Sequence, residues 1–76
     1  MAKYRYLVLI EKGENNYGAY APDLPGCITT GKTPEETLKN MEESISLHLE
    51  GMLRDNDPIP PASHVGADFV EVDIEG

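Results

Sequence analysis

The stretch that decides the fold of this chain is Ala21–Glu36, A-P-D-L-P-G-C-I-T-T-G-K-T-P-E-E. Pro25-Gly26 predicts a type II turn, because proline presets its own φ and glycine tolerates the positive φ that follows. Asp23 suits the same turn, where its carboxylate can accept hydrogen bonds from nearby backbone N–H groups. Cys27–Thr30 is then expected to form a short strand that ends at Gly31.

The end of this stretch predicts where a helix begins. Thr33 is expected to cap the helix, Pro34 suits its first position, and Glu36 lies three residues after the cap, as in a capping box. Apolar residues then recur at spacings of three and four along residues 38–53. This pattern is typical of a helix that buries one face, and residues 55–58, D-N-D-P, are expected to end it.

Strands are expected on both sides of this turn and helix. Tyr4–Glu11 and Tyr17–Ala21 are predicted to form a hairpin, and a last strand is predicted from about Phe69 to Ile74. The order β-β-β-α-β predicts an α+β fold with a three-stranded antiparallel meander, one helix and a fourth strand. Because Tyr4–Glu11 is apolar on both faces, we expect it to be central in the sheet, with one face left for another polypeptide.

The length and the cysteine count bound the stability of the domain. Seventy-six residues are expected to form a single domain, 1–76, with a marginal core. The lone Cys27 forms no intramolecular disulfide, and no zinc-ligand pattern is present. Self-association or a partner is therefore expected. A lone thiol and the lack of a long apolar run predict a cytoplasmic protein without a membrane segment.

The net charge limits the classes of partner that this chain is expected to bind. Fourteen acidic and six basic residues give a net charge of −8. Repulsion from phosphates argues against sequence-independent binding of DNA or RNA. The same charge would attract a basic protein, although it also serves simply to keep a small domain soluble.

The order of elements, the motif D-L-P-G-C at residues 23–27, and then Gly31, Thr33 and Glu36 together resemble the HicB family. The proline-bearing stretch 57–60 extends the resemblance over nearly the whole chain. It implies a partial ribonuclease-H-like fold and assembly into oligomers. Antitoxin members bind and block HicA, a small basic ribonuclease with a catalytic histidine. Many carry a C-terminal DNA-binding domain, and because this chain stops at Gly76, direct DNA binding is not expected.

A ribonuclease-H-like fold raises the question of catalysis. Two-metal cleavage of a phosphodiester needs carboxylates from the first strand, and no acidic residue lies between Tyr4 and Ile10. Cys27 is expected to be a buried thiol, and His48 lies at the edge of the apolar helix stripe. We therefore expect no catalytic, metal or cofactor site. The predicted function is a non-catalytic antitoxin domain, with an orphan self-assembling domain of structural or small-ligand role as the alternative.

Two groups of residues are singled out. Four tyrosines on neighbouring strands and two tail acids are candidates for a partner or oligomer interface, although sheet packing and protection of a strand edge explain them equally simply. These candidates are Tyr4, Tyr6, Tyr17, Tyr20, Glu71 and Asp73. The second group is expected to shape the turn and the helix start, and comprises Asp23, Pro25, Gly26, Gly31, Thr33, Pro34 and Glu36.

Overall fold

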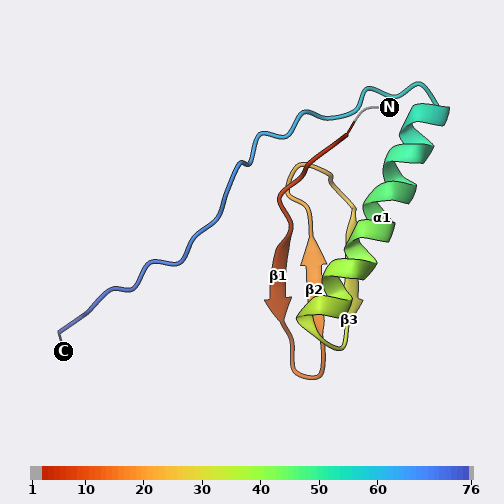
Figure 1. The fold of residues 1–76 in the computed structure, drawn as a ribbon. Coiled ribbons are helices and arrows are strands. Elements are labelled where there is room, and N and C mark those ends of the chain that lie inside the picture. Colours follow the sequence, from red (N-terminus) through yellow and green to blue (C-terminus); the bar gives the residue numbers. More distant parts are fainter. Residues whose placement is uncertain (1–2, 76) are drawn as a thin grey trace.

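Three short strands and one long helix are the regular elements of residues 3–75, the part of the chain described by the computed structural model (Figure 1). They are β1 (Leu9–Lys12), β2 (Tyr17–Tyr20), β3 (Ile28–Gly31) and α1 (Pro34–Arg54). The strands form an antiparallel sheet in the order β1-β2-β3, and α1 packs across one face of it. The predicted α+β class and antiparallel meander are confirmed.

The register of the sheet shows which face the helix covers. Ala19 of β2 is only 4% exposed and lies in the core beneath α1. Its neighbour Tyr20, which pairs with Leu9 and with Ile28, points to the opposite face. Ile28 is 69% exposed there, so one face of the sheet is left open.

The position of the first strand differs from the prediction. β2 is the central strand, whereas β1 lies at an edge of the sheet. Regular pairing begins only at Leu9, and Tyr4–Val8 belongs to no strand. The first strand could be central only with another strand on its outer side, and among the described residues no such strand is present.

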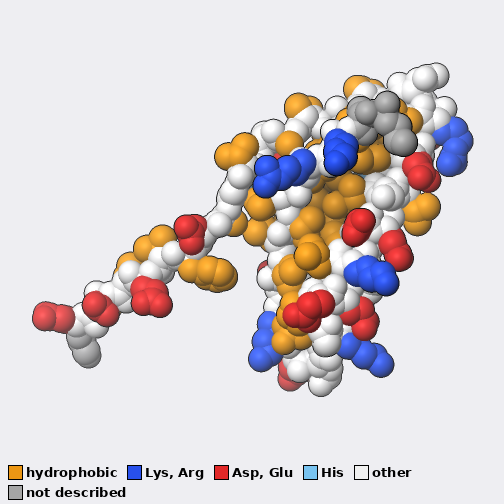
Figure 2. Space-filling view, in the orientation of Figure 1, with side chains coloured by type: hydrophobic (Ala, Val, Ile, Leu, Met, Phe, Trp, Pro, Cys, Tyr) orange, Lys and Arg blue, Asp and Glu red, His pale blue; other side chains and the backbone are white. Residues whose placement is uncertain are grey.

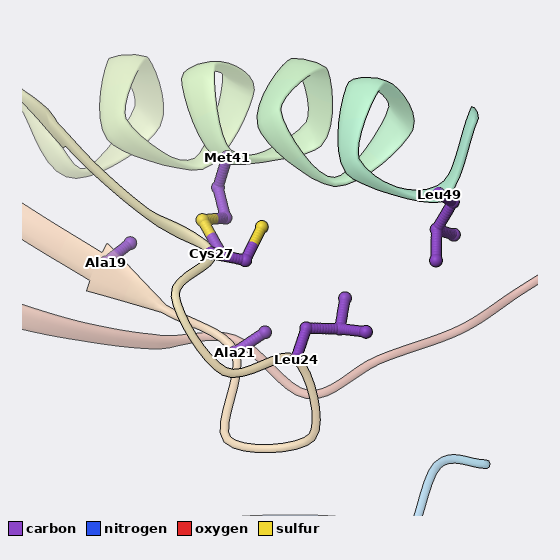
Figure 3. Packing of buried hydrophobic residues seen from close by; sticks show 6 residues of the cluster. All are labelled: Ala19, Ala21, Leu24, Cys27, Met41 and Leu49. Carbon is purple, nitrogen blue, oxygen red and sulfur yellow. The ribbon is translucent and has the colours of Figure 1, made fainter. Parts of the chain in front are cut away.

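Two consecutive turns close the segment Ala21–Cys27. The backbone N–H of Leu24 donates to Ala21 (3.0 Å), and that of Cys27 donates to Leu24 (3.1 Å). Gly26 has a φ of 82°, as expected at the third position of a type II turn. The double turn buries Leu24, which is 1% exposed and forms the core with five other residues (Figure 3): Ala19, Ala21, Cys27, Met41 and Leu49.

Both ends of α1 are capped by local hydrogen bonds. The Thr33 hydroxyl accepts from the backbone N–H of Glu36 (3.0 Å), and the Glu36 carboxylate accepts from that of Lys32 (3.2 Å). At the other end Asn56 adopts a φ of 58°, and the N–H of Asp57 reaches back to Met52 (2.8 Å). This Schellman-type closure ends the helix without a glycine.

β3 and the start of α1 approach each other very closely at Gly31. A Cβ at this position would lie 2.5 Å from Oγ1 of Thr37 and 2.8 Å from its backbone nitrogen. Thr37 itself is completely buried, and its hydroxyl donates to the carbonyl of Thr33 (2.7 Å). Only glycine fits this contact.

The predicted fourth strand does not form in this structure. Residues 55–75 contain no helix or strand, and the chain leaves the body of the molecule as an extended tail (Figure 1). Phe69 is 98% and Ile74 is 87% exposed. The radius of gyration is accordingly 15.1 Å, against about 11 Å for a compact domain of this length. The alternating sequence of residues 69–74 is typical of a strand, but a strand requires an edge to pair with, and these residues pair with none.

Candidate functional site

An apolar groove runs between the segment Tyr4–Val8 and helix α1. Tyr4, Tyr6 and Val8 line one side of it, and the apolar stripe of α1 lines the other. Figure 2 shows this groove as a band of hydrophobic side chains open to solvent. Its volume is about 500 Å³.

The groove exists because α1 covers the sheet unevenly. The helix lies mainly over β2 and β3 and only marginally over β1. Tyr6 and Val8 still reach the edge of the core, but Tyr4 and Leu38 are about half exposed, at 46% and 51%. One side of the hydrophobic core is therefore open where β1 and its N-terminal extension meet the helix.

The backbone beside this groove is also available. Over residues 3–75, Tyr4–Val8 takes part in no strand ladder, so its amide and carbonyl groups are unpaired with any strand. Ala62, His64 and Val65 line a second hollow with this segment. The Tyr6 hydroxyl donates to the carbonyl of Pro60, which holds the segment after α1 alongside. Burial is the main cause that raises the pKa of this hydroxyl, and it stays a hydrogen-bond donor.

A second cluster fastens that segment to the double turn. The Asp23 carboxylate accepts from the hydroxyl of Ser63 (2.7 Å) and from the backbone N–H groups of Ser63 (3.0 Å) and His64 (3.1 Å). It also lies 2.7 Å from Nδ1 of His64. The Asp23 side chain is 6% exposed, and these bonds, led by the Ser63 hydroxyl, hold its pKa far below the ordinary range.

We call Asp23, Ser63 and His64 the tail clamp. The sequence predicted only a local turn role for Asp23, whose bonding partners lie 40 and 41 residues further along the chain. The Ser63 hydroxyl donates to the Asp23 carboxylate, and Nδ1 of His64 lies 3.4 Å from that hydroxyl. The same ring nitrogen contacts the carboxylate, whereas a Ser-His-Asp triad uses the two ring nitrogens for the two partners. The arrangement positions the tail.

Only two of the six predicted interface residues lie together at the groove. Tyr4 and Tyr6 line the groove, whereas Tyr17 pairs opposite Lys12 and Tyr20 opposite Leu9. Tyr4 and Tyr6 precede β1, so neither of them pairs with Tyr17 or Tyr20 across the hairpin. The two remaining candidates, Glu71 and Asp73, lie on the exposed tail.

Catalytic groups are not assembled in the described part of the molecule. Cys27 is 4% exposed, and burial raises the pKa of its thiol, which disfavours the reactive thiolate. His48 lines the same shallow hollow as Cys27. In residues 3–75 no three His, Cys, Asp or Glu side chains converge as a metal site would require. α1 is too polar to cross a bilayer, and it is the one helix in this range.

Comparison with known proteins identifies the family. Residues 6–76 match the family model described as HicB-like antitoxin of bacterial toxin-antitoxin system. The chain belongs to the HicB-like antitoxin family. The match includes the residues of the double turn, the helix and the tail.

Relatives of this HicB-like chain include proteins with and without an assigned role. An uncharacterized 14.9 kDa protein of Haemophilus phage HP1 is 40% identical over 79% of this chain and 45% of its own length. A UPF0150 protein of Synechocystis is 40% identical over 75% of this chain and 73% of its own. Antitoxin HicB 1 of Photorhabdus laumondii is 35% identical over 92% and 46%. The chain thus spans about half the length of the phage protein and of antitoxin HicB 1.

A solved structure supports the fold. A chain of a HicA3 and HicB3 toxin-antitoxin complex matches with a TM-score of 0.67 and 32% identity. The match covers 78% of this chain and 70% of the other. The HicB-like arrangement of the meander and the helix is therefore shared with a protein taken from a toxin-antitoxin assembly.

Proposed function

We propose that this HicB-like chain is a non-catalytic antitoxin domain that binds a small basic ribonuclease of the HicA type and inhibits it by covering its active surface. The observation that carries this proposal is the likeness in fold and sequence to a chain of the HicA3 and HicB3 complex. An inhibitor of this kind acts stoichiometrically, so it requires a complementary surface and no reactive groups.

The distribution of charge supports a basic partner. The exposed positions of α1 include Lys39 and four acids, Glu35, Glu42, Glu43 and Glu50. Six more acids and no Lys or Arg follow the helix, namely Asp55, Asp57, Asp68, Glu71, Asp73 and Glu75. Opposite charge accelerates encounter with a basic toxin and disfavours wrong partners. We place the toxin on the acidic side of α1.

Self-association and a cytoplasmic location belong to the same proposal. The open groove beside Tyr4–Val8 and the exposed apolar side chains of the tail are surfaces that a second copy would cover. A cytoplasmic location agrees with the single unpaired thiol and with a target that degrades RNA. The same exposed surfaces support the alternative, an orphan domain that assembles with itself and meets no toxin.

Co-expression with a small basic ribonuclease of the HicA type tests the proposal. We expect the two proteins to co-purify and growth arrest by the toxin to be reversed. Glu43→Lys on α1 should weaken both effects, whereas Glu14→Lys, the same change in the loop between β1 and β2, should leave them intact. Failure of the unmodified chain to co-purify and to restore growth would reject the antitoxin function.

A further inference from the structure

We propose that two copies of this chain exchange their tails, so that residues 69–74 of each copy form the missing edge strand beside Tyr4–Val8 of the other. This inference rests on the self-association proposed above and is independent of toxin binding. It accounts for two incomplete features of the single chain. Residues 69–74 have the sequence of a strand but pair with none, and Tyr4–Val8 leads into β1 but also pairs with no strand.

The tail has the pattern of a strand with one buried face. Val70, Val72 and Ile74 alternate with Glu71 and Asp73. In the single chain the three apolar side chains are 84%, 72% and 87% exposed. An extended segment with this alternation is suited to add to a sheet edge with its apolar side turned inward.

The receiving edge is largely apolar where it borders the groove. Tyr4, Tyr6 and Val8 line the groove together with Arg5, whereas Leu7 does not line it. A strand paired to this edge would insert its own inward side chains into the groove, against the apolar stripe of α1. The three apolar side chains of the tail are therefore suited to cover the open side of the core.

Opposite charge favours pairing of the two segments. Glu71 and Asp73 alternate with the apolar residues of the tail. The receiving segment exposes Lys3 and Arg5, and Arg5 lies at the groove itself. Opposite charges on neighbouring strands stabilise pairing, and residues 55–75 hold no Lys or Arg that would compete.

The tail clamp favours a second copy over closure on the same chain. Asp23 holds Ser63 and His64 at the end of the sheet, and from there the tail runs outward from the side of β1 and away from the body (Figure 1). Ala62, His64 and Val65 still line a hollow with Tyr6–Val8, whereas Val70, Val72 and Ile74 remain exposed and pair with no strand of their own chain. Because each copy offers one tail and one edge, a two-fold pair satisfies both and leaves no further copy to add.

Substitutions in the tail test whether it forms the interface. The 8.4 kDa chain should sediment as a dimer at micromolar concentration. Val72→Asp should raise the dimer dissociation constant at least about tenfold, because it removes a buried apolar side chain. The neighbouring Asp73→Asn faces outward and should change it by less than about fivefold. Equal dissociation constants for Val72→Asp and the unmodified chain would overturn the proposal.

Isotope mixing tests where the tail goes without any substitution. In dimers of one ¹³C-labelled and one unlabelled chain, filtered NOE spectra should show the Val72 methyl groups in contact with the Tyr6 ring. Both residues are central in their segments, so the contact is expected for either strand direction. A dimer in which this contact occurs only within one chain would overturn the exchange but not self-association. A monomer would overturn both, and neither result bears on toxin binding.

Discussion

At the scale of single residues, two positions hold separate elements of the chain together. Gly31 lets β3 touch the first turn of α1, where Thr37 is completely buried. Asp23 ties the double turn to the start of the tail. Each acts through a contact that its own neighbours in sequence do not make.

Gly31→Ala should destabilise the domain by about 1–3 kcal/mol, because the methyl group would overlap backbone atoms that have no room to move. Gly51 is the matched control, because a Cβ there meets nothing within 4 Å. Gly51→Ala should stabilise α1 by about 0.5–1 kcal/mol. Urea unfolding measures both. An unchanged unfolding free energy in Gly31→Ala would contradict the close approach.

Asp23→Asn should weaken the clamp in a pH-dependent way. The folded-state pKa of Asp23 lies below its ordinary value of 3.8, so the unfolded chain binds the proton more tightly. The carboxylate therefore contributes its full stabilisation above about pH 5 and loses it progressively as the pH falls below about 4. Thermal unfolding should show the two proteins converging between about pH 6 and about pH 3. A constant difference over this range would refute the assignment.

At the scale of elements, α1 organises the domain, because it carries the buried stripe and both of its ends are capped. Its N-terminus follows directly from β3 through two residues, so the cap also determines where the strand stops. Because Thr37 in the first turn of α1 is completely buried, the helix cannot begin elsewhere without exposing it.

Thr33→Ala should cost about 1 kcal/mol of unfolding free energy, because the N–H of Glu36 loses its acceptor. Thr33→Ser keeps a hydroxyl in the same place and should retain most of the stability. Chemical denaturation followed by far-UV circular dichroism compares them. If serine proves as damaging as alanine, the methyl group and not the hydrogen bond is what matters at this position.

At the scale of the whole molecule, the charge is unevenly distributed. The net charge is −8, and ten of the fourteen acids are named above at exposed positions of α1 and in the tail. Only Lys12 of the six basic residues lies in a strand, and α1 carries Lys39 and Arg54 beside its acids. The excess of acid on α1 and in the tail attracts cations, and it orients the proposed encounter with a basic toxin.

Association with the toxin should depend on salt through its on-rate. Raising NaCl from about 50 mM to about 500 mM should slow association by about tenfold or more and change dissociation much less, because screening weakens long-range attraction. Stopped-flow mixing measures the two rates. Glu43→Lys should flatten the salt dependence, and an association rate indifferent to salt would exclude the acidic side of α1 as the docking surface.

The sequence alone determined the features that depend on neighbouring residues. Pro25-Gly26 predicted the type II turn, Thr33 predicted the cap, and the apolar spacing of residues 38–53 predicted the helix with its buried face. In each case the groups that interact lie within one or two turns of chain, so the local order of residue types suffices.

Only the tertiary structure decided the rest. The clamp joins Asp23 to Ser63 and His64, which lie 40 and 41 positions further along the chain. The spacing of these residues in the sequence does not predict their contact. The alternation of residues 69–74 predicts a strand that the structure does not form, because pairing requires an edge and the single chain does not bring its own edge to these residues. Strand propensity is a local property, whereas strand pairing depends on where distant backbone groups, or those of another copy, come to lie.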